Sequence, residues 1–229
     1  MHEWAFNDTN PIGVPGSMNS MPSGFGSGVT RMSTYWPNSI LQDSLGRLYE
    51  LIYTVGVGWN FHHLFLTSNF TGVAMLPGGS NAKLDRWNMV FQQSDGVMVN
   101  SVGNQTIDYT PGNLKQPIPR GAAIGGFAVP RASDPTQFNS YVLSQADSGE
   151  IQMTWTTDGT NWQGPKGFSA LKKADKDTNI ACLTPSSWPT TNLLPQFDMA
   201  RCYFQVRGVL REVIYDGKDW KDLGAIPMP

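Results

Sequence analysis

Charged residues are scarce in this chain, and it has neither a basic cluster nor a long apolar run. Only 15% of its 229 residues are Asp, Glu, Lys or Arg, and the formal net charge is −2. Without a basic block, the sequence offers no electrostatic footprint for nucleic acid or for an anionic membrane surface. No stretch reaches the roughly 18 apolar residues that a membrane-spanning helix needs. We therefore expect no nucleic acid and no membrane as partners.

The chain also lacks an export signal, because its N-terminus has neither a basic region nor an apolar stretch. We expect a cytoplasmic location, with secretion by an unconventional route as the alternative. Cysteine is limited to Cys182 and Cys202, which lie on neighbouring predicted strands. A disulfide between them is geometrically feasible, but two buried thiols fit better with a chain that shows no other sign of secretion.

The motifs of common catalytic and metal sites are missing as well. The sequence has no Gly-Lys-Ser/Thr phosphate loop, no Gly-x-Ser-x-Gly elbow and no His-Glu-x-x-His. His62 and His63 are adjacent, so on a strand they point to opposite faces and cannot easily share one metal. The acidic segment from Asp175 has Ile180 where a calcium loop needs glycine. We expect no metal and no cofactor.

Turn-forming residues are abundant, with 24 glycines and 16 prolines, and helical periodicity is almost absent. Short β-rich segments instead alternate with Gly, Asp, Asn or Pro, which is typical of strands joined by tight loops. Asp95-Gly96, Asp158-Gly159 and Asp216-Gly217 predict hairpins with type I′ turns, which need two residues that tolerate positive φ.

A motif recurs about every fifty residues along the chain, and its last copy, from Ala200 to Trp220, is the most complete. Repeats of this length that are made of short strands predict a β-propeller. The fold class is therefore all-β, a propeller of four-stranded blades that occupies residues 1–229 as one domain. The equivalent third-strand positions of the copies are Glu3, Glu50, Asn100, Met153 and Glu212.

The pattern accommodates four complete blades and an opening half blade at Met1–Ile12. We expect five blades, with six as the alternative. The predicted strands are Arg31–Trp36, Ser39–Asp43, Leu48–Tyr53 and His62–Thr67; Gly72–Leu76, Trp87–Gln92, Val97–Val102 and a poorly marked outer strand; Ile124–Val129, Ser140–Gln145, Ile151–Thr156 and a strand near Trp162; and Asn179–Leu183, Arg201–Gln205, Leu210–Tyr215 and Trp220–Ile226.

The last copy is similar to the repeat of the fungal fucose-specific lectin family of the Aleuria aurantia type. The residues that carry the resemblance are Arg201-Cys202-Tyr203-Phe204-Gln205, Leu210-Arg211-Glu212 and Asp216-Gly217-Lys218-Asp219-Trp220. The resemblance implies a six-bladed propeller with a sugar pocket between adjacent blades. In such a pocket an Arg and a Glu hydrogen-bond sugar hydroxyls, and an aromatic ring stacks on the C–H face of the sugar.

The resemblance assigns these roles position by position, and only the last copy keeps all three residue types. There, Arg201 and Glu212 would bind the sugar, with Trp220 or a neighbouring aromatic such as Trp4 stacking on it. The other copies match as follows: Glu50 and Trp59 are kept while Ser39 stands in the place of Arg; Asn88 and Asn100 replace Arg and Glu; Tyr141 and Met153 replace them while Trp162 remains; and Glu3 and Trp4 begin the first copy.

With at most one intact pocket, we expect carbohydrate (fucose-like) binding by a degenerate lectin-type propeller. The Arg201–Glu212 pair could equally be an ordinary cross-strand ion pair. The alternative function is that of a cofactor-free cyclase of the kind that resembles this family in fungal secondary metabolism. Such a hetero-Diels–Alder enzyme would hold an apolar terpenoid or polyketide substrate in a shaped cavity. Either way the partner is a small molecule, and a homodimer is left open.

Overall fold

The computed structural model describes residues 4–7, 10–15, 29–35, 38–54, 56–67, 71–78, 86–104, 109–131, 133–134, 136–183 and 199–227. These residues form four antiparallel sheets of four strands each and one two-stranded hairpin. Within each sheet the strands pair in sequence order, without crossovers, which is the meander of a propeller blade. The all-β propeller architecture predicted above is therefore confirmed.

The strands divide into an N-terminal hairpin and four blades, numbered in chain order, and the 3₁₀ turn η2 follows blade 3. Their bounds are, for the hairpin, β1 Trp4–Asn7 and β2 Asn10–Pro15; for blade 1, β3 Val29–Tyr35, β4 Asn38–Asp43, β5 Arg47–Thr54 and β6 Gly58–Leu66; for blade 2, β7 Val73–Pro77, β8 Arg86–Gln92, β9 Val97–Asn104 and β10 Thr110–Pro117; for blade 3, β11 Ile124–Pro130, β12 Phe138–Gln145, β13 Ile151–Thr156 and β14 Gln163–Gly167; η2 Ser169–Leu171; and for blade 4, β15 Ala181–Leu183, β16 Met199–Val206, β17 Val209–Asp216 and β18 Trp220–Ala225.

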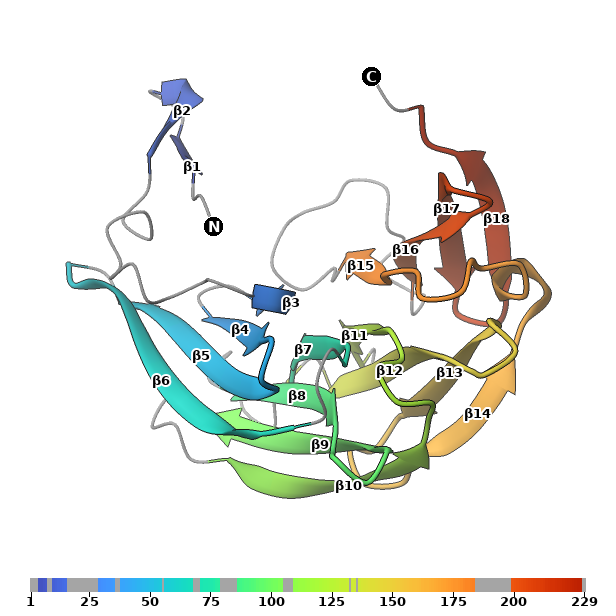
Figure 1. Ribbon diagram of the computed structural model, residues 1–229, viewed down its shortest axis with the longest axis horizontal. Coiled ribbons are helices and arrows are strands. Elements are labelled where there is room, and N and C mark those ends of the chain that lie inside the picture. Colours follow the sequence, from blue (N-terminus) through green and yellow to red (C-terminus); the bar gives the residue numbers. More distant parts are fainter. Residues whose placement is uncertain are drawn as a thin grey trace.

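The first strand of each blade lies near the centre of the molecule and the fourth lies at its periphery (Figure 1). The innermost strands contact one another in order, β3 with β7, β7 with β11 and β11 with β15. Their approach is close enough that a Cβ atom on Gly72 would lie 2.0 Å from the backbone nitrogen of Ile124. Glycine at this position therefore permits blades 2 and 3 to meet at the axis.

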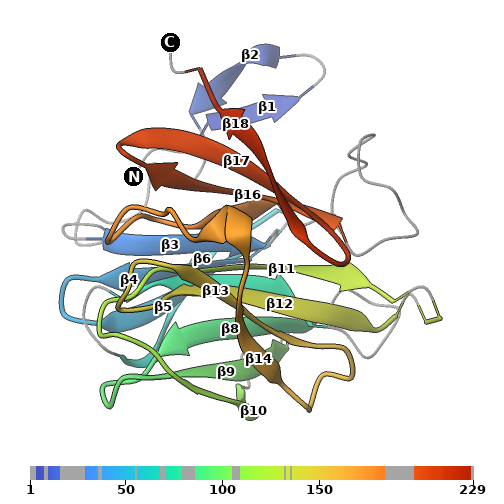
Figure 2. The ribbon, with the colours of Figure 1, turned by 90° about the vertical axis from the view of Figure 1, so that its right-hand side faces the viewer.

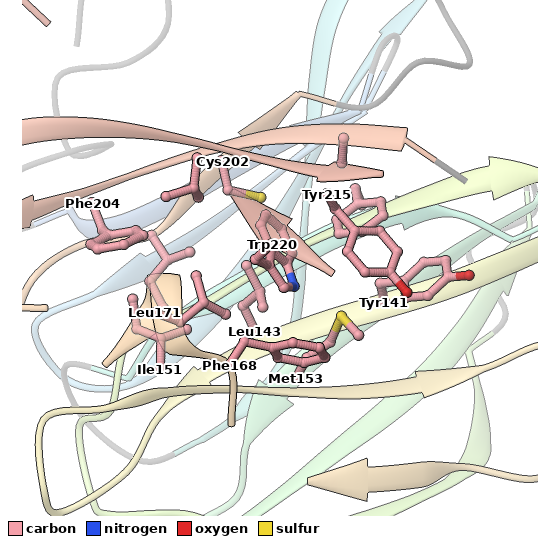
Figure 3. Packing of buried hydrophobic residues seen from close by; sticks show 14 of the residues in the cluster. Tyr141, Leu143, Ile151, Met153, Phe168, Leu171, Cys202, Phe204, Tyr215 and Trp220 are labelled. Atoms are coloured by element: carbon pink, nitrogen blue, oxygen red, sulfur yellow. The ribbon is translucent and has the colours of Figure 1, made fainter. Parts of the chain in front are cut away.

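Three apolar clusters fill the spaces between consecutive blades. Because side chains alternate along a strand, each blade sends one set of residues to the blade before it and the other set to the blade after it. In β8, Trp87 and Met89 pack towards blade 1, whereas Val90 packs towards blade 3. The cluster between blades 3 and 4 contains Phe168, Leu171, Phe204 and Trp220 (Figure 3).

A buried glutamine at the end of the second strand ties blades 1, 2 and 3 to the connection that follows the outer strand. In blade 2, Gln92 Nε2 donates to the carbonyl oxygens of Gly96, Ile118 and Pro119, and its Oε1 accepts from Gly121 N. Gln145 makes the equivalent bonds in blade 3, and Gln42 bonds to the Thr67 hydroxyl in blade 1. The glutamine at this position in blade 4, Gln205, is exposed.

The Asp-Gly turns lie between strands as predicted, but their backbone conformation differs from type I′. Gly96, Gly159 and Gly217 have φ of 89°, 81° and 90°, while the preceding aspartates are not among the residues with positive φ. Only the glycine adopts the left-handed conformation, because each aspartate carboxylate accepts bonds from backbone N–H groups of the turn instead.

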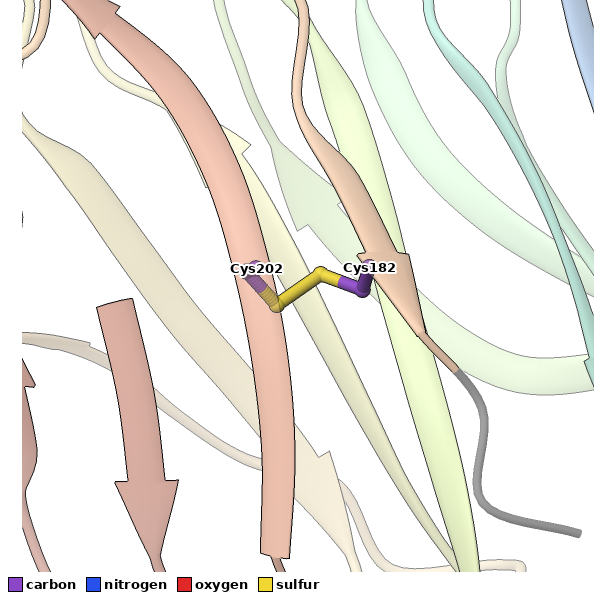
Figure 4. Close-up of a disulfide and its surroundings, with 2 residues drawn as sticks. All are labelled: Cys182 and Cys202. Carbon is purple, nitrogen blue, oxygen red and sulfur yellow. A yellow bond between two sulfur atoms is a disulfide. The ribbon is translucent and has the colours of Figure 1, made fainter. Parts of the chain in front are cut away.

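The prediction of two free thiols is wrong, since Cys182 and Cys202 form a disulfide (Figure 4). They are directly paired residues on β15 and β16, with Cα atoms 4.1 Å apart. Strand pairing brought the two sulfurs together, and the absence of an export signal was not sufficient reason to expect thiols.

Among the helices of the described residues, none is long and apolar enough to cross a membrane.

We predict that Gln92→Ala lowers the free energy of unfolding by about 3 kcal/mol, because several buried backbone groups lose their partner together. Gln205→Ala is the matched control, since the exposed side chain predicts a change of less than about 0.5 kcal/mol. Chemical denaturation of both variants measures the difference. Equal effects would show that the buried glutamine does not hold the connection between blades.

Candidate functional site

Arg201, Tyr203 and Glu212 form a hydrogen-bonded cluster on one face of blade 4. Arg201 Nη1 donates to Glu212 Oε1 at 2.7 Å, and the Tyr203 hydroxyl donates to the same oxygen at 3.0 Å. The cluster arises because Tyr203 pairs directly with Glu212 across β16 and β17, and Arg201 lies two residues before Tyr203 on the same face. The Arg201 and Glu212 side chains are 29% and 21% exposed, so a ligand can reach both.

The electrostatics of the cluster keep the tyrosine protonated. Burial raises the pKa of Tyr203, and its hydrogen bond to the Glu212 carboxylate raises it further. The hydroxyl is therefore a fixed donor to Glu212, which also pairs with a cation. Within the described residues, no hydrogen bond engages the second carboxylate oxygen, Oε2, of Glu212. The cluster thus offers an orientated acceptor beside the remaining donors of the guanidinium.

Trp220 is not part of this cluster, because it lies on the opposite face of the blade 4 sheet. It pairs with Tyr215, whose side chain faces blade 3, and only 2% of its surface is exposed. Its ring meets Phe127 edge-on, with ring centroids 6.0 Å apart. It also packs against Tyr215, with ring centroids 5.2 Å apart (Figure 3). The last repeat therefore brings Arg201 and Glu212 together but contributes Trp220 to the space between blades 3 and 4.

In blade 3, the equivalents of Arg201 and Glu212 belong to the apolar core. Tyr141 stacks on Phe127 with ring centroids 4.7 Å apart, and Met153 is 1% exposed in the same cluster. Both side chains face Trp220 and Tyr215 of blade 4. At the positions equivalent to Arg201 and Glu212, blade 3 therefore has aromatic and apolar packing against blade 4 and no polar pair for a ligand.

In blade 2, the equivalent pair is made of two buried amides. Asn100 Nδ2 donates to Asn88 Oδ1 at 2.8 Å, and Asn100 Oδ1 accepts from the backbone nitrogen of Leu114. Asn88 and Asn100 are 7% and 3% exposed. The two amides hydrogen-bond to each other and to the outer strand, so the arrangement is typical of a structural contact between strands.

In blade 1, the strand register corrects one position of the sequence comparison. Glu50 pairs with Ile40, so the residue that corresponds to Arg201 is Asn38 and not Ser39. The Ser39 side chain points to the other face and bonds to the Thr34 hydroxyl at 2.9 Å. The error was one residue, which on a strand is enough to exchange the two faces.

Glu50 is a fully buried carboxyl group with unsatisfied hydrogen-bonding capacity. It is 0% exposed, and neither of its oxygens accepts a well-formed hydrogen bond; the Oδ1 atom of Asn38 is unsatisfied as well. Burial raises the pKa of Glu50 to about 7, and the neighbouring Tyr109 hydroxyl offsets only part of that rise. Tyr109 in turn accepts a hydrogen bond from Trp87 Nε1 at 2.8 Å. This polar group lies between blades 1 and 2.

Among the remaining predicted site residues, Trp59 lies apart from both groups. Trp59 pairs with Tyr53 on the face of blade 1 opposite Glu50, and the two rings meet edge-on at 5.5 Å. Trp4 is in β1, but its side chain, like the whole of Glu3, lies outside the described residues. His62 pairs with Glu50 and His63 with Tyr49, so the histidines face opposite sides as predicted.

The acidic segment from Asp175 has a structural role. The Asp175 carboxylate accepts from the backbone nitrogens of Arg207 and Gly208 and so supports the turn between β16 and β17. In the part of the chain that the structure describes, no group of three or more His, Cys, Asp or Glu side chains is arranged to hold a metal ion.

The raised pKa of Glu50 predicts a pH-dependent stability. Its usual value is 4.5 and its value in the fold is about 7, so the folded protein resists ionising it. As the pH rises from 4.5 to 7, the wild type should lose roughly 2 kcal/mol of unfolding free energy relative to Glu50→Gln. Denaturation curves between pH 5 and pH 8 measure this difference. Parallel profiles would mean that Glu50 ionises as easily in the fold as in the unfolded chain.

No protein-family model and no curated protein matches the sequence. The structure, however, is similar to solved lectins. One is AofleA from Arthrobotrys oligospora, with a TM-score of 0.74, 17% identity, and coverage of 99% of this chain and 65% of that one. Another is the Aleuria aurantia lectin, a six-bladed β-propeller with a fucose recognition mode, with a TM-score of 0.73, 16% identity, and coverage of 100% and 71%.

A third similar structure is the SapL1 lectin in complex with α-methyl fucoside, with a TM-score of 0.63, 15% identity, and coverage of 84% of this chain and 62% of that one. The chain thus spans 65% of the length of AofleA and 62% of that of SapL1. At these identities the similarity concerns the fold. The four blades described above have the β-propeller fold of the Aleuria aurantia lectin.

Proposed function

We propose that the protein binds a neutral, fucose-like sugar on the face of blade 4 that carries Arg201, Tyr203 and Glu212. The observation that supports this most is the geometry of the three side chains. A guanidinium and a carboxylate are held 2.7 Å apart by a tyrosine and a strand register, yet both remain partly exposed. An arrangement fixed before the ligand arrives loses little entropy on binding.

The cluster matches the chemistry of adjacent sugar hydroxyls. A hydroxyl group can accept from the guanidinium N–H groups and donate to the free Oε2 of Glu212 at the same time. The ring of Tyr203 and the side chain of Ile214, which pairs with Arg201, lie on the same face. They provide apolar surface for the C–H face of a sugar ring.

Fucose is the first sugar to test, because the lectins of the same fold are described with it. The Aleuria aurantia lectin has a fucose recognition mode, and SapL1 is in complex with α-methyl fucoside. Among the four described blades, only blade 4 combines an arginine with a glutamate, while the equivalent positions of blades 2 and 3 are occupied by packed amides or apolar groups. We therefore propose a single site, which would bind without the avidity of a multivalent lectin.

A second candidate function is that of a cyclase acting on an apolar substrate, and Glu50 is the observation that favours it. A carboxyl group with a pKa of about 7 among aromatic side chains can donate or accept a proton at neutral pH. In this proposal Glu50 or the adjacent Tyr109 would polarise the substrate in the space between blades 1 and 2. Turnover of terpenoid or polyketide precursors that Glu50→Gln abolishes would support it.

For the sugar site, we predict that L-fucose binds the wild type with a dissociation constant in the millimolar range or below. Arg201→Ala should weaken binding at least about tenfold, because a charge-assisted hydrogen bond is lost. Tyr203→Phe should weaken it by a smaller factor, since it releases Glu212 without removing a ligand contact. Isothermal titration calorimetry measures all three.

Arg47→Ala is the matched control for this series. Arg47 also pairs with a carboxylate, Asp43, at 2.6 Å, but that pair belongs to a turn of blade 1. Fucose binding by this variant should equal that of the wild type. If neither fucose nor any sugar of a glycan array binds the wild type, the Arg201–Glu212 pair is an ordinary cross-strand ion pair and the proposed function is wrong.

A further inference from the structure

A hollow lies on the other face of blade 4, away from the Arg201 cluster. It is a groove of about 800 Å³ between the segment that contains η2 and strands β16, β17 and β18. Phe204, Val206, Val209 and Trp220 contribute its apolar lining. Its volume lies within the range of small-molecule sites, which is about 300–1,000 Å³.

Positive charge collects along this groove, although the whole chain carries a net charge of −2. Lys173, Arg207 and Arg211 line it, together with a single carboxylate, Asp222. Arg211 forms an ion pair with Asp222. Among the described residues, no carboxylate lies within ion-pair distance of the Lys173 ammonium or the Arg207 guanidinium. Two cations of the groove are therefore available to a ligand.

A charged side chain on one side of the groove influences a carboxylate on the other side. Burial would raise the pKa of Asp222, but the hydrogen bonds from Arg211 and from the backbone nitrogen of Gly224 lower it overall, and the charge of Lys173 adds a smaller lowering. Lys173, on the segment that follows η2, is thus close enough to influence a carboxylate on β18. A second carboxylate placed in the groove would experience the same attraction from Lys173.

We propose that this groove binds a small carboxylate-bearing ligand. The carboxylate would lie between Lys173 and Arg207, and the body of the ligand would pack on the apolar walls formed by Val206 and Val209. The ligand is a uronic-acid sugar or an aryl carboxylate, since both combine an oxyanion with an apolar face. This site is on the opposite face from the Arg201 cluster, so either proposal can fail without the other.

The test uses two matched pairs of probes that differ in charge. Methyl β-D-glucuronide is compared with methyl β-D-glucoside, and phenylacetate with benzyl alcohol, by calorimetry at low ionic strength. We expect the charged member of one pair to bind and its neutral partner not to bind, and the pair that responds identifies the body of the ligand. High salt should weaken this binding, because exposed charges are screened.

Two variants locate the binding. Arg207 has a positive φ of 54°, so Arg207→Gly removes the charge and relieves the backbone at once. Lys173→Met keeps the apolar stem. Each should weaken binding about three- to fivefold, the scale of one solvent-screened ion pair. The control, Lys172→Met, changes a neighbouring exposed lysine that does not line the groove.

Arg201→Ala should leave binding of the charged probe unchanged, which separates this site from the proposed sugar site. If neither charged probe binds, if charged and neutral probes bind equally, or if Lys172→Met weakens binding as much as Lys173→Met, the proposal is overturned.

Discussion

The alternation of side chains along each strand is the constraint on which the rest of this structure depends. A blade is a single sheet, so the side chains of each strand must suit the blade before it on one face and the blade after it on the other. In β16, Cys202 and Phe204 turn towards blade 3 while Arg201 and Tyr203 turn away from it. A shift of one residue would bury the charged pair and expose the core. The polar cluster and the packing of blade 4 therefore both depend on the same strand register.

Strand positions proved easy to predict from the sequence where a strand is buried on both faces and bounded by turn residues. The inner three strands of blades 1 to 3 lie within a few residues of the prediction, and the hairpin at Trp4–Asn7 and Asn10–Pro15 corresponds to the expected half blade. The outer strand of blade 2, Thr110–Pro117, could not be marked, because it is mostly exposed and shows no apolar alternation. The expected total of five blades, with six as the alternative, stays a prediction.

The site was less predictable, for a reason that also lies in the alternation. Sequence comparison assembled Arg201, Glu212 and Trp220 as one group. Tyr215, which pairs with Trp220, follows Glu212 by three residues, and this odd separation places the tryptophan on the other face. Tyr203 was missed as a site residue although the spacing Arg-x-Tyr put it beside Arg201. The unsatisfied carboxyl of Glu50 could not be foreseen, because burial on this scale depends on the neighbouring blade.

Because blade 4 contains a disulfide, the redox conditions under which a sample is produced affect its structure. β15 is only three residues long, and the bond between Cys182 and Cys202 attaches it covalently to the strand that carries Arg201 and Tyr203. Cytosolic reductants normally keep cysteine pairs reduced, so a disulfide contrasts with the cytoplasmic location expected from the N-terminus. Protein made in a reducing host and protein made in an oxidising one are therefore different molecules at blade 4, and ligand screens on the two need not agree.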